Sequence, residues 1–322
     1  MRAATARACA NIALVKYWGK RPGGENLPAT GSLSLTLDGL QTETTVQFDS
    51  ALAEDRFTLN GRPFDVSKIT EFLDIIRSLA DMTTRAAVTT RNEFPTASGL
   101  ASSASGFSAL AVAATAAAGA DLDPAALSRI ARRGSGSAAR SIFGGFVRMH
   151  AGASDAEAYA VPIASPLTDA VRMVIAVVGG GAAKAHGSRS AMNHVAQTSP
   201  LYPNWLDLVP SDLAAAEAAL ASGDLAALGE IAEGNALAMH ATALAARPAI
   251  HYWLPATVSV LAAVRSLRER GRAAWATMDA GPHVKVLTTI GDAADVEREL
   301  TAIEGVTATM ITKPGYGAKV VQ

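Results

Sequence analysis

The feature that most constrains the fold is a turn of small residues that leads into a long apolar segment, residues 92–118. Pro95 disfavours helix at the residue before it, and Gly99 permits backbone angles that other residues resist. The segment 107–118 is apolar and rich in alanine, which is typical of a buried helix. We therefore predict a helix that starts near Leu100 and lies inside the fold, with the turn at its N-terminus.

Two interpretations of this turn stay open on the segment alone. The unpaired N–H groups and the dipole at a helix N-terminus stabilise an anion, and small side chains let a ligand approach the backbone. The small residues here are Gly99, Ala101, Ser102 and Ser103. Alternatively, the segment is only a buried helix with a tight turn before it. It is not a P-loop in either case, because no Gly-Lys-Ser/Thr follows.

Length and charge narrow the class of protein. The chain has 322 residues, enough for two domains, and 49% of them are hydrophobic whereas 18% are charged. This balance is typical of a well-packed soluble protein and argues against disorder. Because the net charge is −1, no basic field would recruit nucleic acid or an anionic membrane, and we expect neither as a partner. Any phosphate binding must come from local groups of residues.

The cysteine count and the apolar runs point to a cytoplasmic protein. Cys9 is the only cysteine, so the sequence offers no disulfide framework and no thiolate metal cluster. The N-terminus lacks the apolar core of a signal peptide. The apolar runs at 107–118 and 170–178 are too short, or too rich in small residues, to span a membrane. The six histidines are scattered and show no spacing for zinc or iron.

Strands dominate the first half of the chain. Asp38-Gly39 separates two segments that alternate with a period of two, 32–37 and 42–48, which predicts a hairpin with its turn at these two residues. Asp123-Pro124 predicts the start of a short helix that ends at Gly134. We expect a helix at 66–79 and further strands at 8–15, 57–61, 86–90, 145–149, 158–163 and 171–178.

The run Gly179-Gly180-Gly181 breaks the chain, and the composition becomes helical beyond it. We place the domain boundary here, between a first domain of residues 1–181 and a second of residues 182–322. The second domain is predicted to contain helices at 188–198, 206–220, 225–244, 258–270 and 293–303, and strands at 273–278, 283–287 and 306–311, with a closing turn at 313–317.

Three cations and two aromatic residues follow the first predicted strand, at residues 16–21. Lys16 and Lys20 beside Tyr17 and Trp18 suit a site that holds a polyanion against a ring face. A solvated cationic edge is the alternative. The clustering favours a binding role.

A second turn of serine and glycine, Ser135-Gly136-Ser137, precedes a predicted helical segment that carries Arg140. A Ser-Gly-Ser turn and a fork-shaped cation at this spacing can clamp a carboxylate or a phosphate. A serine-capped helix with an exposed arginine explains the same residues equally well.

Asp279 comes directly after an apolar strand and shortly before Gly281-Pro282, so it is displayed at a strand end, where catalytic carboxylates often lie. From the sequence alone, an aspartate that caps a turn is the better interpretation. Ser102, Ser103 and Ser105 lie in no Gly-x-Ser-x-Gly elbow, which argues against a hydrolase.

Together these residues offer what phosphoryl transfer needs, namely cations and amides around a polyphosphate, Mg²⁺, and a carboxylate near the accepting hydroxyl. The cations in question are Lys16, Lys20, Arg140, Lys184 and Arg189.

Four motifs resemble those of known proteins. Pro-Thr-Ala-Ser-Gly-Leu-Ala-Ser-Ser-Ala-Ser at 95–105 resembles the phosphate-binding motif of the GHMP kinase superfamily. Within that superfamily, Lys16-Tyr-Trp-Gly-Lys-Arg, Ser135-Gly-Ser-Ala-Ala-Arg-Ser and Thr277-Met-Asp-Ala-Gly-Pro resemble the diphosphomevalonate decarboxylase family. The motifs occur in the family's order and cover nearly the whole chain, from residue 8 to residue 317.

The resemblance implies an α+β, two-domain GHMP kinase fold. Its N-terminal domain would resemble ribosomal protein S5 domain 2 and bind ATP, its C-terminal domain would be ferredoxin-like, and the active site would lie between them. Family members use ATP with Mg²⁺ and are commonly homodimers.

The resemblance also implies a reaction of the mevalonate pathway of isoprenoid biosynthesis. ATP would phosphorylate the tertiary C3 hydroxyl of (R)-5-diphosphomevalonate, phosphate would depart, and the carboxylate would be lost as CO₂. The products would be isopentenyl diphosphate, ADP and phosphate.

The motif match assigns roles to single residues. Asp279 would orient or deprotonate the C3 hydroxyl, Lys16 would stabilise charge beside it, and Arg140 would clamp the substrate carboxylate. The substrate would be bound by Tyr17, Lys20, Ser135, Gly136, Ser137, Ser188 and Arg189. The ATP phosphates would be bound by Ser98, Gly99, Leu100, Ala101, Ser102, Ser103 and Ser105, with Ser102 and Ser103 nearest Mg²⁺.

Two departures from the family pattern leave the substrate open. His283 stands where the family usually has Asn. Ser188-Arg189-Ser190-Ala191-Met192, with His186 before it, replaces the more usual Ser-Arg-Asp/Ser-Gly-Met and departs from it at Ser190-Ala191. Relatives that decarboxylate 5-phosphomevalonate share the same Asp, Lys and Arg, and related 3-kinases phosphorylate without loss of CO₂. We expect the diphosphate as substrate, and decarboxylation rather than phosphorylation alone. A non-catalytic sensor is disfavoured, because no expected charged residue is missing.

Overall fold

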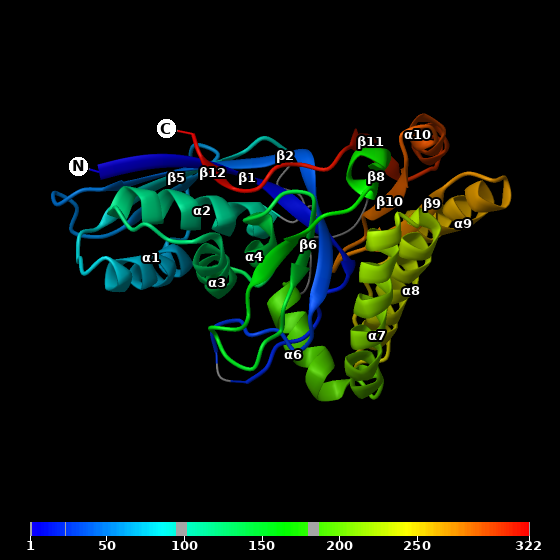
Figure 1. The fold of residues 1–322 in the computed structure, drawn as a ribbon, viewed down its shortest axis with the longest axis horizontal. Coiled ribbons are helices and arrows are strands. Elements are labelled where there is room, and N and C mark those ends of the chain that lie inside the picture. The colour runs from blue at the N-terminus through cyan, green and yellow to red at the C-terminus, as the bar shows by residue number, and fades with distance from the viewer. Residues whose placement is uncertain (1, 23, 95–101, 180–186, 322) are drawn as a thin grey trace.

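Two β-sheets organise the chain, and helices cover them (Figure 1). The computed structural model describes residues 2–22, 24–94, 102–179 and 187–321. In these residues the first sheet has eight strands in the order β12-β1-β2-β5-β3-β4, and β6 pairs with β2 and with β7. Its strands are β1 (Arg2–Val15), β2 (Ser32–Phe48), β3 (Arg56–Leu59), β4 (Arg62–Pro63), β5 (Ala86–Asn92), β6 (Phe146–Met149), β7 (Ala160–Ile163) and β12 (Lys319–Val320).

The long strand β2 corrects one expectation from the sequence. The predicted hairpin at Asp38-Gly39 is wrong, because β2 continues through these residues, and Gly39 adopts a positive φ of 77°. The pairing of β1 with β2 shifts register here, between Cys9 and Asn11. Asp-Gly accepts left-handed backbone in a bulge as readily as in a turn, and β1 is long enough to pair with both halves of β2. The two alternating segments therefore form one strand.

The buried helix predicted from the sequence is α2 (Ser102–Ala118), which packs against β1 and β2. It lies on the same face of the first sheet as α1 (Ser67–Leu79) and α3 (Pro124–Gly134) (Figure 1). Asp123 caps α3 as predicted, since its carboxylate accepts a hydrogen bond from the Ala126 N–H at 2.7 Å. The remaining helices of this part are the single turns α4 (Ala138–Ser141) and α5 (Leu167–Ala170).

The second sheet has four antiparallel strands in the order β11-β8-β10-β9. Its strands are β8 (Val171–Val178), β9 (Ala274–Met278), β10 (Val284–Thr289) and β11 (Val306–Thr312). The helices of this part are α6 (Ser188–Thr198), α7 (Tyr202–Ser222), α8 (Leu225–Leu244), α9 (Pro255–Glu269) and α10 (Ala293–Thr301). The helices α8, α9 and α10 pack against the sheet.

Strand β8 bears on the position of the domain boundary. It precedes the glycines at 179–181, where the sequence places the boundary, yet it pairs with β10 and β11 of the second sheet. We propose that the boundary lies before β8, in the segment 164–170.

A shared hydrophobic core fixes how the two parts face each other. Ile12 and Leu14 of β1 belong to the same buried cluster as Trp205 of α7 and Met239 of α8. Trp205 Nε1 also donates a hydrogen bond to the Trp18 carbonyl at 2.9 Å. The end of β1 is thereby held against α7 and α8.

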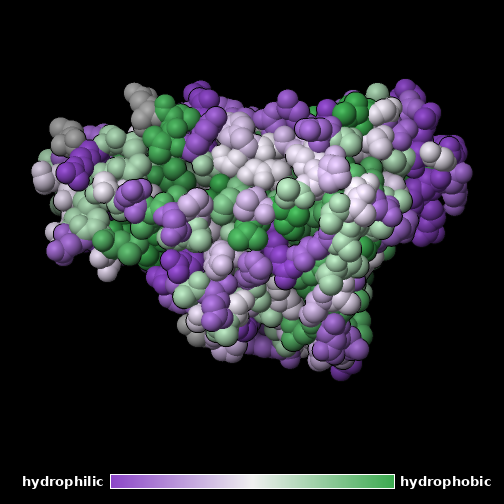
Figure 2. Space-filling view, in the orientation of Figure 1, coloured by the Kyte–Doolittle hydropathy of each residue, from purple (hydrophilic) through white to green (hydrophobic). Residues whose placement is uncertain are grey.

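On the face of the molecule that Figure 2 shows, the surface is polar or of mixed polarity. Figure 2 shows polar side chains gathered at the end of the molecule that α9 and α10 form, with polar and apolar residues interspersed elsewhere. Among the described residues, no helix combines the length and the apolar character needed to cross a membrane.

Candidate active site

Asp279 directly follows β9 and lies between two lysines. Its Oδ1 is 3.0 Å from Lys16 Nζ, and its Oδ2 is 3.3 Å from Lys285 Nζ. The lysine side chains are only 2% and 1% exposed, whereas that of Asp279 is 27% exposed. The carboxylate is therefore fixed by two buried cations and stays accessible to a bound molecule.

Lys16 is held in place by the end of β1 and by α8. Its ammonium donates to the Ala13 carbonyl at 2.8 Å, and its backbone N–H donates to Asn235 Oδ1, also at 2.8 Å. Asn235 Nδ2 donates in turn to Asp212 Oδ2 of α7 at 2.7 Å. Both the oxygen and the nitrogen of the Asn235 amide are used in this way. Helices α7 and α8, which accompany the second sheet, therefore fix the position of Lys16, which follows a strand of the first sheet.

Asp279 and Lys285 owe their proximity to the antiparallel pairing of β9 with β10. Lys285 lies opposite Thr277, two residues before Asp279. Side chains two residues apart on a strand share a face, so the carboxylate emerges on the side of the sheet where the lysine lies. Thr277 Oγ1 donates to the Ala13 carbonyl at 3.4 Å, which ties this hairpin to β1.

The surrounding charges set the ionisation of Asp279 and Lys16. Burial would raise the pKa of Asp279, but the ammonium groups of Lys16 and Lys285 outweigh it and hold that pKa well below its usual range. Burial lowers the pKa of Lys16 to about 8, opposed by Asp279 and assisted by Lys285 and Arg140. At neutral pH the site therefore holds an ionised carboxylate beside a cation that titrates just above neutrality.

Arg140 reaches this region from α4 and is 2% exposed. Its Nε donates to Asn11 Oδ1 at 3.2 Å, its Nη1 donates to Ser32 Oγ at 2.6 Å, and its Cζ lies 6.0 Å from the centre of the Tyr17 ring. Burial lowers its pKa to about 10, which leaves the guanidinium charged at neutral pH. Its hydrogen-bond partners are neutral, so its charge is available to an anionic ligand.

The predicted serine turn lies beside the start of α2. Ser135 Oγ donates to Ser103 Oγ at 3.4 Å, and 3.3 Å separates the hydroxyls of Ser135 and Ser137. Gly136 packs so closely against Tyr17 that a Cβ at this position would overlap the ring. The structure thus brings the turn together with Tyr17 and with the N-terminus of α2.

The predicted phosphate-binding serines differ in exposure. Ser102 is half-buried and Ser103 is exposed at the first turn of α2, where unpaired N–H groups favour an anion. Ser105 is buried, and its hydroxyl lies 2.7 Å from Thr42 Oγ1 of β2. That hydroxyl joins α2 to the sheet, and its role toward phosphate stays a prediction. The other predicted phosphate contacts lie outside the described residues: Ser98, Gly99, Leu100 and Ala101.

A cavity of about 820 Å³ lies between the loop after β1, α1, the C-terminal end of α3 and α6. Its lining contains five cations and two carboxylates: Lys20, Arg21, Lys68, Arg133, Arg189, Glu25 and Glu71. Burial lowers the pKa of Lys20 to about 8, and the positive charges of Arg189 and Lys68 act in the same direction. An excess of positive charge at this density suits a polyanion. Ser188 begins α6 next to Arg189 and is exposed.

Tyr17 lies between the predicted catalytic groups and this cavity. Its ring faces Arg140, and its hydroxyl donates to the Asn26 carbonyl at 3.3 Å. Asn26 lines the cavity. The predicted catalytic groups do not line this cavity. The candidate site therefore consists of a catalytic region and an adjoining cationic cavity, and Tyr17 lies between the two.

Reasoning from the sequence missed several residues that hold the catalytic groups. These are Asn11, Ser32, Asp212, Asn235 and Lys285. Asn11 and Lys285 do carry a signal, because each is a polar residue inside an apolar run, and a buried polar group needs a partner. Asn235 lies in an alanine-rich helix with other polar residues and offers no such signal.

The two departures from the family pattern have local structural partners. His283 is 4% exposed, and its Nδ1 accepts a hydrogen bond from the Val178 N–H at 3.0 Å, which joins the start of β10 to the end of β8. Ala191 is fully buried in α6, and Ser190 Oγ donates to the Gly187 carbonyl at 2.9 Å.

The predicted nucleotide end of the site suits Mg²⁺ that is bound together with phosphate. In the described ranges of the chain, no group of three or more His, Cys, Asp or Glu could hold a metal ion. Mg²⁺ prefers oxygen ligands and is often held by one or two protein groups with phosphate oxygens and water. The hydroxyls of Ser102 and Ser103 at the N-terminus of α2 fit such a donor set.

Two family models together match most of the chain. Residues 8–160 match the family model of the diphosphomevalonate decarboxylase-like N-terminal domain. Residues 173–315 match that of the mevalonate 5-diphosphate decarboxylase C-terminal domain.

Individual proteins match nearly the whole chain. A diphosphomevalonate decarboxylase of Aspergillus fumigatus is 35% identical over 97% of this chain and 83% of its own length. A phosphomevalonate decarboxylase of Haloferax volcanii is 33% identical over 89% of this chain and 88% of its own length. Among solved structures, the protein chain in a structure described as MDDEF in complex with MVAPP, AMPPCP and magnesium is 42% identical to this chain. The two structures superpose with a TM-score of 0.95, over 100% of this chain and 99% of that one. The chain therefore belongs to the diphosphomevalonate decarboxylase family, within the GHMP kinase superfamily.

Proposed function

We propose that the protein decarboxylates (R)-5-diphosphomevalonate at the expense of ATP, giving isopentenyl diphosphate, ADP, phosphate and CO₂. The observation that carries this proposal is the accessible carboxylate of Asp279, held ionised by Lys16 and Lys285 and accompanied by the buried guanidinium of Arg140. Family membership supports the same reaction.

In this proposal Asp279 accepts a hydrogen bond from the C3 hydroxyl of the substrate. That bond directs the hydroxyl oxygen toward the γ-phosphoryl group of ATP. The low pKa of Asp279 makes it a weak base for an unactivated alcohol. Its main task is therefore orientation, and it takes the proton once the new O–P bond makes the hydroxyl acidic. The ammonium of Lys16, 3.0 Å away, stabilises the negative charge on the reacting oxygens.

Arg140 serves the second half of the reaction. The guanidinium fork binds the substrate carboxylate and aligns the C1–C2 bond with the C3–O bond. When phosphate leaves with the C3–O electron pair, C3 becomes electron-deficient. The C1–C2 pair then forms the C2=C3 double bond and CO₂ departs. Because the partners of Arg140 are neutral, no protein carboxylate among them competes with that of the substrate.

We assign binding of the substrate and binding of the ATP phosphates to two further groups of residues. Tyr17, Lys20, Ser135, Gly136, Ser137, Ser188 and Arg189 would hold the substrate, and 98–103 with Ser105 would hold the phosphates of ATP. Mg²⁺, when bound at Ser102 and Ser103, would neutralise phosphate charge. The solved complex of a 42% identical relative with AMPPCP and magnesium supports this assignment.

A second candidate substrate is 5-phosphomevalonate, which would give isopentenyl phosphate. The observation that favours it is the 33% identity with the phosphomevalonate decarboxylase of Haloferax volcanii. A mevalonate 3-kinase that releases no CO₂ is the remaining alternative. We expect Asp279 together with Lys16 and Arg140 to favour decarboxylation over phosphorylation alone.

One experiment separates these activities. The purified protein is given ATP and Mg²⁺ with either the diphosphate or the monophosphate, and ADP and CO₂ are followed together. We expect equal amounts of ADP and CO₂, and a higher kcat/KM for the diphosphate. Equal or better turnover of the monophosphate would reassign the substrate, and ADP without CO₂ would reassign the reaction.

We also propose that the protein acts in the cytoplasm as a homodimer. The assembly is what the resemblance to the family implies. Light scattering coupled to gel filtration would test it, because a mass of about 33 kDa would indicate a monomer and twice that mass a dimer.

A further inference from the structure

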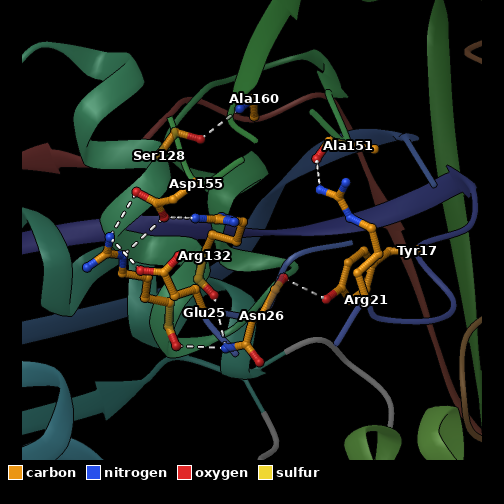
Figure 3. A network of polar contacts seen from close by, with 10 residues as sticks. Tyr17, Arg21, Glu25, Asn26, Ser128, Arg132, Ala151, Asp155 and Ala160 are labelled. Carbon is orange, nitrogen blue, oxygen red and sulfur yellow. Dashed lines mark hydrogen bonds and ion pairs between the residues drawn. The ribbon is translucent and has the colours of Figure 1, made fainter. Parts of the chain in front are cut away.

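Asn26 lines the cationic cavity and contacts two residues of the proposed substrate site, Lys20 and Tyr17, as well as the end of α3. Figure 3 shows the contacts of Asn26 with Tyr17 and with the end of α3. Its backbone has a left-handed conformation, with φ 53°, in the loop between β1 and β2. Its Oδ1 accepts a hydrogen bond from Lys20 Nζ at 2.5 Å, and its carbonyl accepts one from the Tyr17 hydroxyl at 3.3 Å. Its Nδ2 donates to the carbonyls of Arg132 and Arg133, at 3.1 and 2.7 Å.

Those two carbonyls belong to the last turn of α3. The final carbonyls of a helix lack partners within it and carry the negative end of the helix dipole. The turn Ser135-Gly136-Ser137 follows directly, and Arg133 and Gly134 line the cavity. Uncovered carbonyls here would repel a phosphate in the cavity. The amide of Asn26 covers both of them and turns its oxygen toward Lys20.

A neutral amide suits this position better than other side chains of its size. Because Asn26 carries no charge, it orients the ammonium of Lys20 without neutralising it. An aspartate would form an ion pair with Lys20 and would place a negative charge against the two carbonyls. A glycine would keep the left-handed backbone but would leave the ammonium and both carbonyls without this partner.

The surrounding loop is anchored independently of the Asn26 side chain. Glu25 Oε1 lies 2.9 Å from Arg133 Nη2, and Asp155 forms ion pairs with Arg132 and, at 2.8 Å, with Arg133 (Figure 3). These contacts attach the loop and the 151–157 segment to the end of α3. Substitution of Asn26 is therefore expected to change the orientation of its partners and to leave the fold intact.

We propose that Asn26 is a positioning residue that sets the spacing between the Lys20–Tyr17 pair and the 135–137 turn, and thereby the affinity for the phosphoryl end of the substrate. The identity of that substrate rests on the proposed function. The geometry itself requires only a phosphorylated anion.

The test compares Asn26→Gly and Asn26→Asp with the wild type in two assays. Steady-state kinetics with diphosphomevalonate should show KM raised roughly tenfold for Asn26→Gly, with kcat within about threefold, because a hydrogen bond to a charged group is lost away from the reacting atoms. Asn26→Asp should raise KM further, because its carboxylate competes for Lys20. Calorimetric titration with inorganic pyrophosphate should show weaker binding in the same order.

Matched controls are Asn60→Gly and Asn60→Asp. Asn60 also has a left-handed backbone, φ 50°, but it lies in the exposed turn between β3 and β4. Both control variants should keep the KM and the pyrophosphate affinity of the wild type.

The outcomes separate this inference from the proposed function. Unchanged KM and pyrophosphate affinity in both Asn26 variants would overturn the inference, as would a fall in kcat with KM unchanged. If the wild type fails to turn over diphosphomevalonate but binds pyrophosphate, and the Asn26 variants weaken that binding, the proposed function fails and the role of Asn26 stands.

Discussion

The ionisation of Asp279 depends on its immediate neighbours. Two ammonium groups lie within 3.3 Å of its oxygens, and both lysines are almost fully buried. Burying a charge without a partner is costly, so the carboxylate offsets part of the cost of burying the two lysine side chains. The three residues therefore act as a unit, and removing any one charge changes the electrostatic surroundings of the other two.

Replacing Asp279 with Asn should abolish most of the activity and leave binding of the substrate largely intact. The amide can still contact the C3 hydroxyl, but it cannot accept the proton, and it removes the negative charge that both lysines contact. We expect kcat to fall by roughly 10²- to 10⁴-fold in the ADP-release assay. Asp169→Asn, a change at an exposed aspartate of α5, is the control. A turnover within a few-fold of wild type would remove Asp279 from the mechanism.

The activity should decline above about pH 8 because Lys16 must be protonated. Burial lowers the pKa of Lys16 to about 8, so its positive charge is present below that pH and is lost as the pH rises through it. The test is kcat at saturating substrate between about pH 6 and 10, which separates Lys16 from Lys20, whose titration affects substrate binding. In Lys16→Arg the charge persists, so the alkaline decline in kcat should move to higher pH. An identical decline in that variant would assign it to another group.

At the scale of elements, β9 and α8 must approach closely for Asp279 to reach Lys16. Gly229 of α8 permits this, because a Cβ there would overlap the ring of Trp275 in β9. The Trp275 indole N–H also donates to Glu230 Oε1 at 2.9 Å, on the next residue of the helix. The small size of Gly229 lets α8 approach β9 closely, and the hydrogen bond from Trp275 to Glu230 holds the two elements together.

The two glycines of α8 give a matched pair for testing this contact. Gly229→Ala should destabilise the protein by about 1–3 kcal/mol, because the indole ring is large and cannot yield without disturbing the core. Gly234→Ala meets no atom within 4 Å and should be neutral or stabilising by up to about 1 kcal/mol, as alanine favours helix. Urea unfolding of both variants measures the difference. Equal midpoints would show that the close approach of α8 to β9 contributes nothing.

Local patterns in the sequence predict most elements but not the contacts between them. The helices α1 and α3 follow from apolar spacing and from the Asp123 cap, which are local properties. The hairpin at Asp38-Gly39 was predicted wrongly, because the same dipeptide also fits a bulge and the choice depends on the partner strand. The pairing of Lys16 with Asp279 joins residues 263 positions apart, which no local pattern encodes. The motifs that contain Lys16 and Asp279 became informative only because they resemble those of a known family.

At the scale of the whole molecule, the two parts share a core rather than meeting at a polar interface. The cluster that contains Ile12 and Leu14 also contains Trp205 and Met239, and Asn235 ties α8 to the backbone of Lys16. Interfaces between independent domains are usually more polar and allow relative motion. Here the buried contacts place the active site where both parts are fixed, so the geometry of the Lys16–Asp279 pair depends on the stability of that core.

The shared core predicts that both parts unfold together. Trp205 is 2% exposed and donates to the Trp18 carbonyl, so Trp205→Ala removes apolar contacts and a hydrogen bond at the junction and should cost about 3–5 kcal/mol. Hydrogen exchange followed by mass spectrometry on peptides from β2 and β10 should show both strands losing protection by the same factor. Calorimetry of the wild type should show a single transition. If β10 alone lost protection, or if the wild type unfolded in two steps, the two parts would be independent domains, and the active site would lie between bodies that can separate.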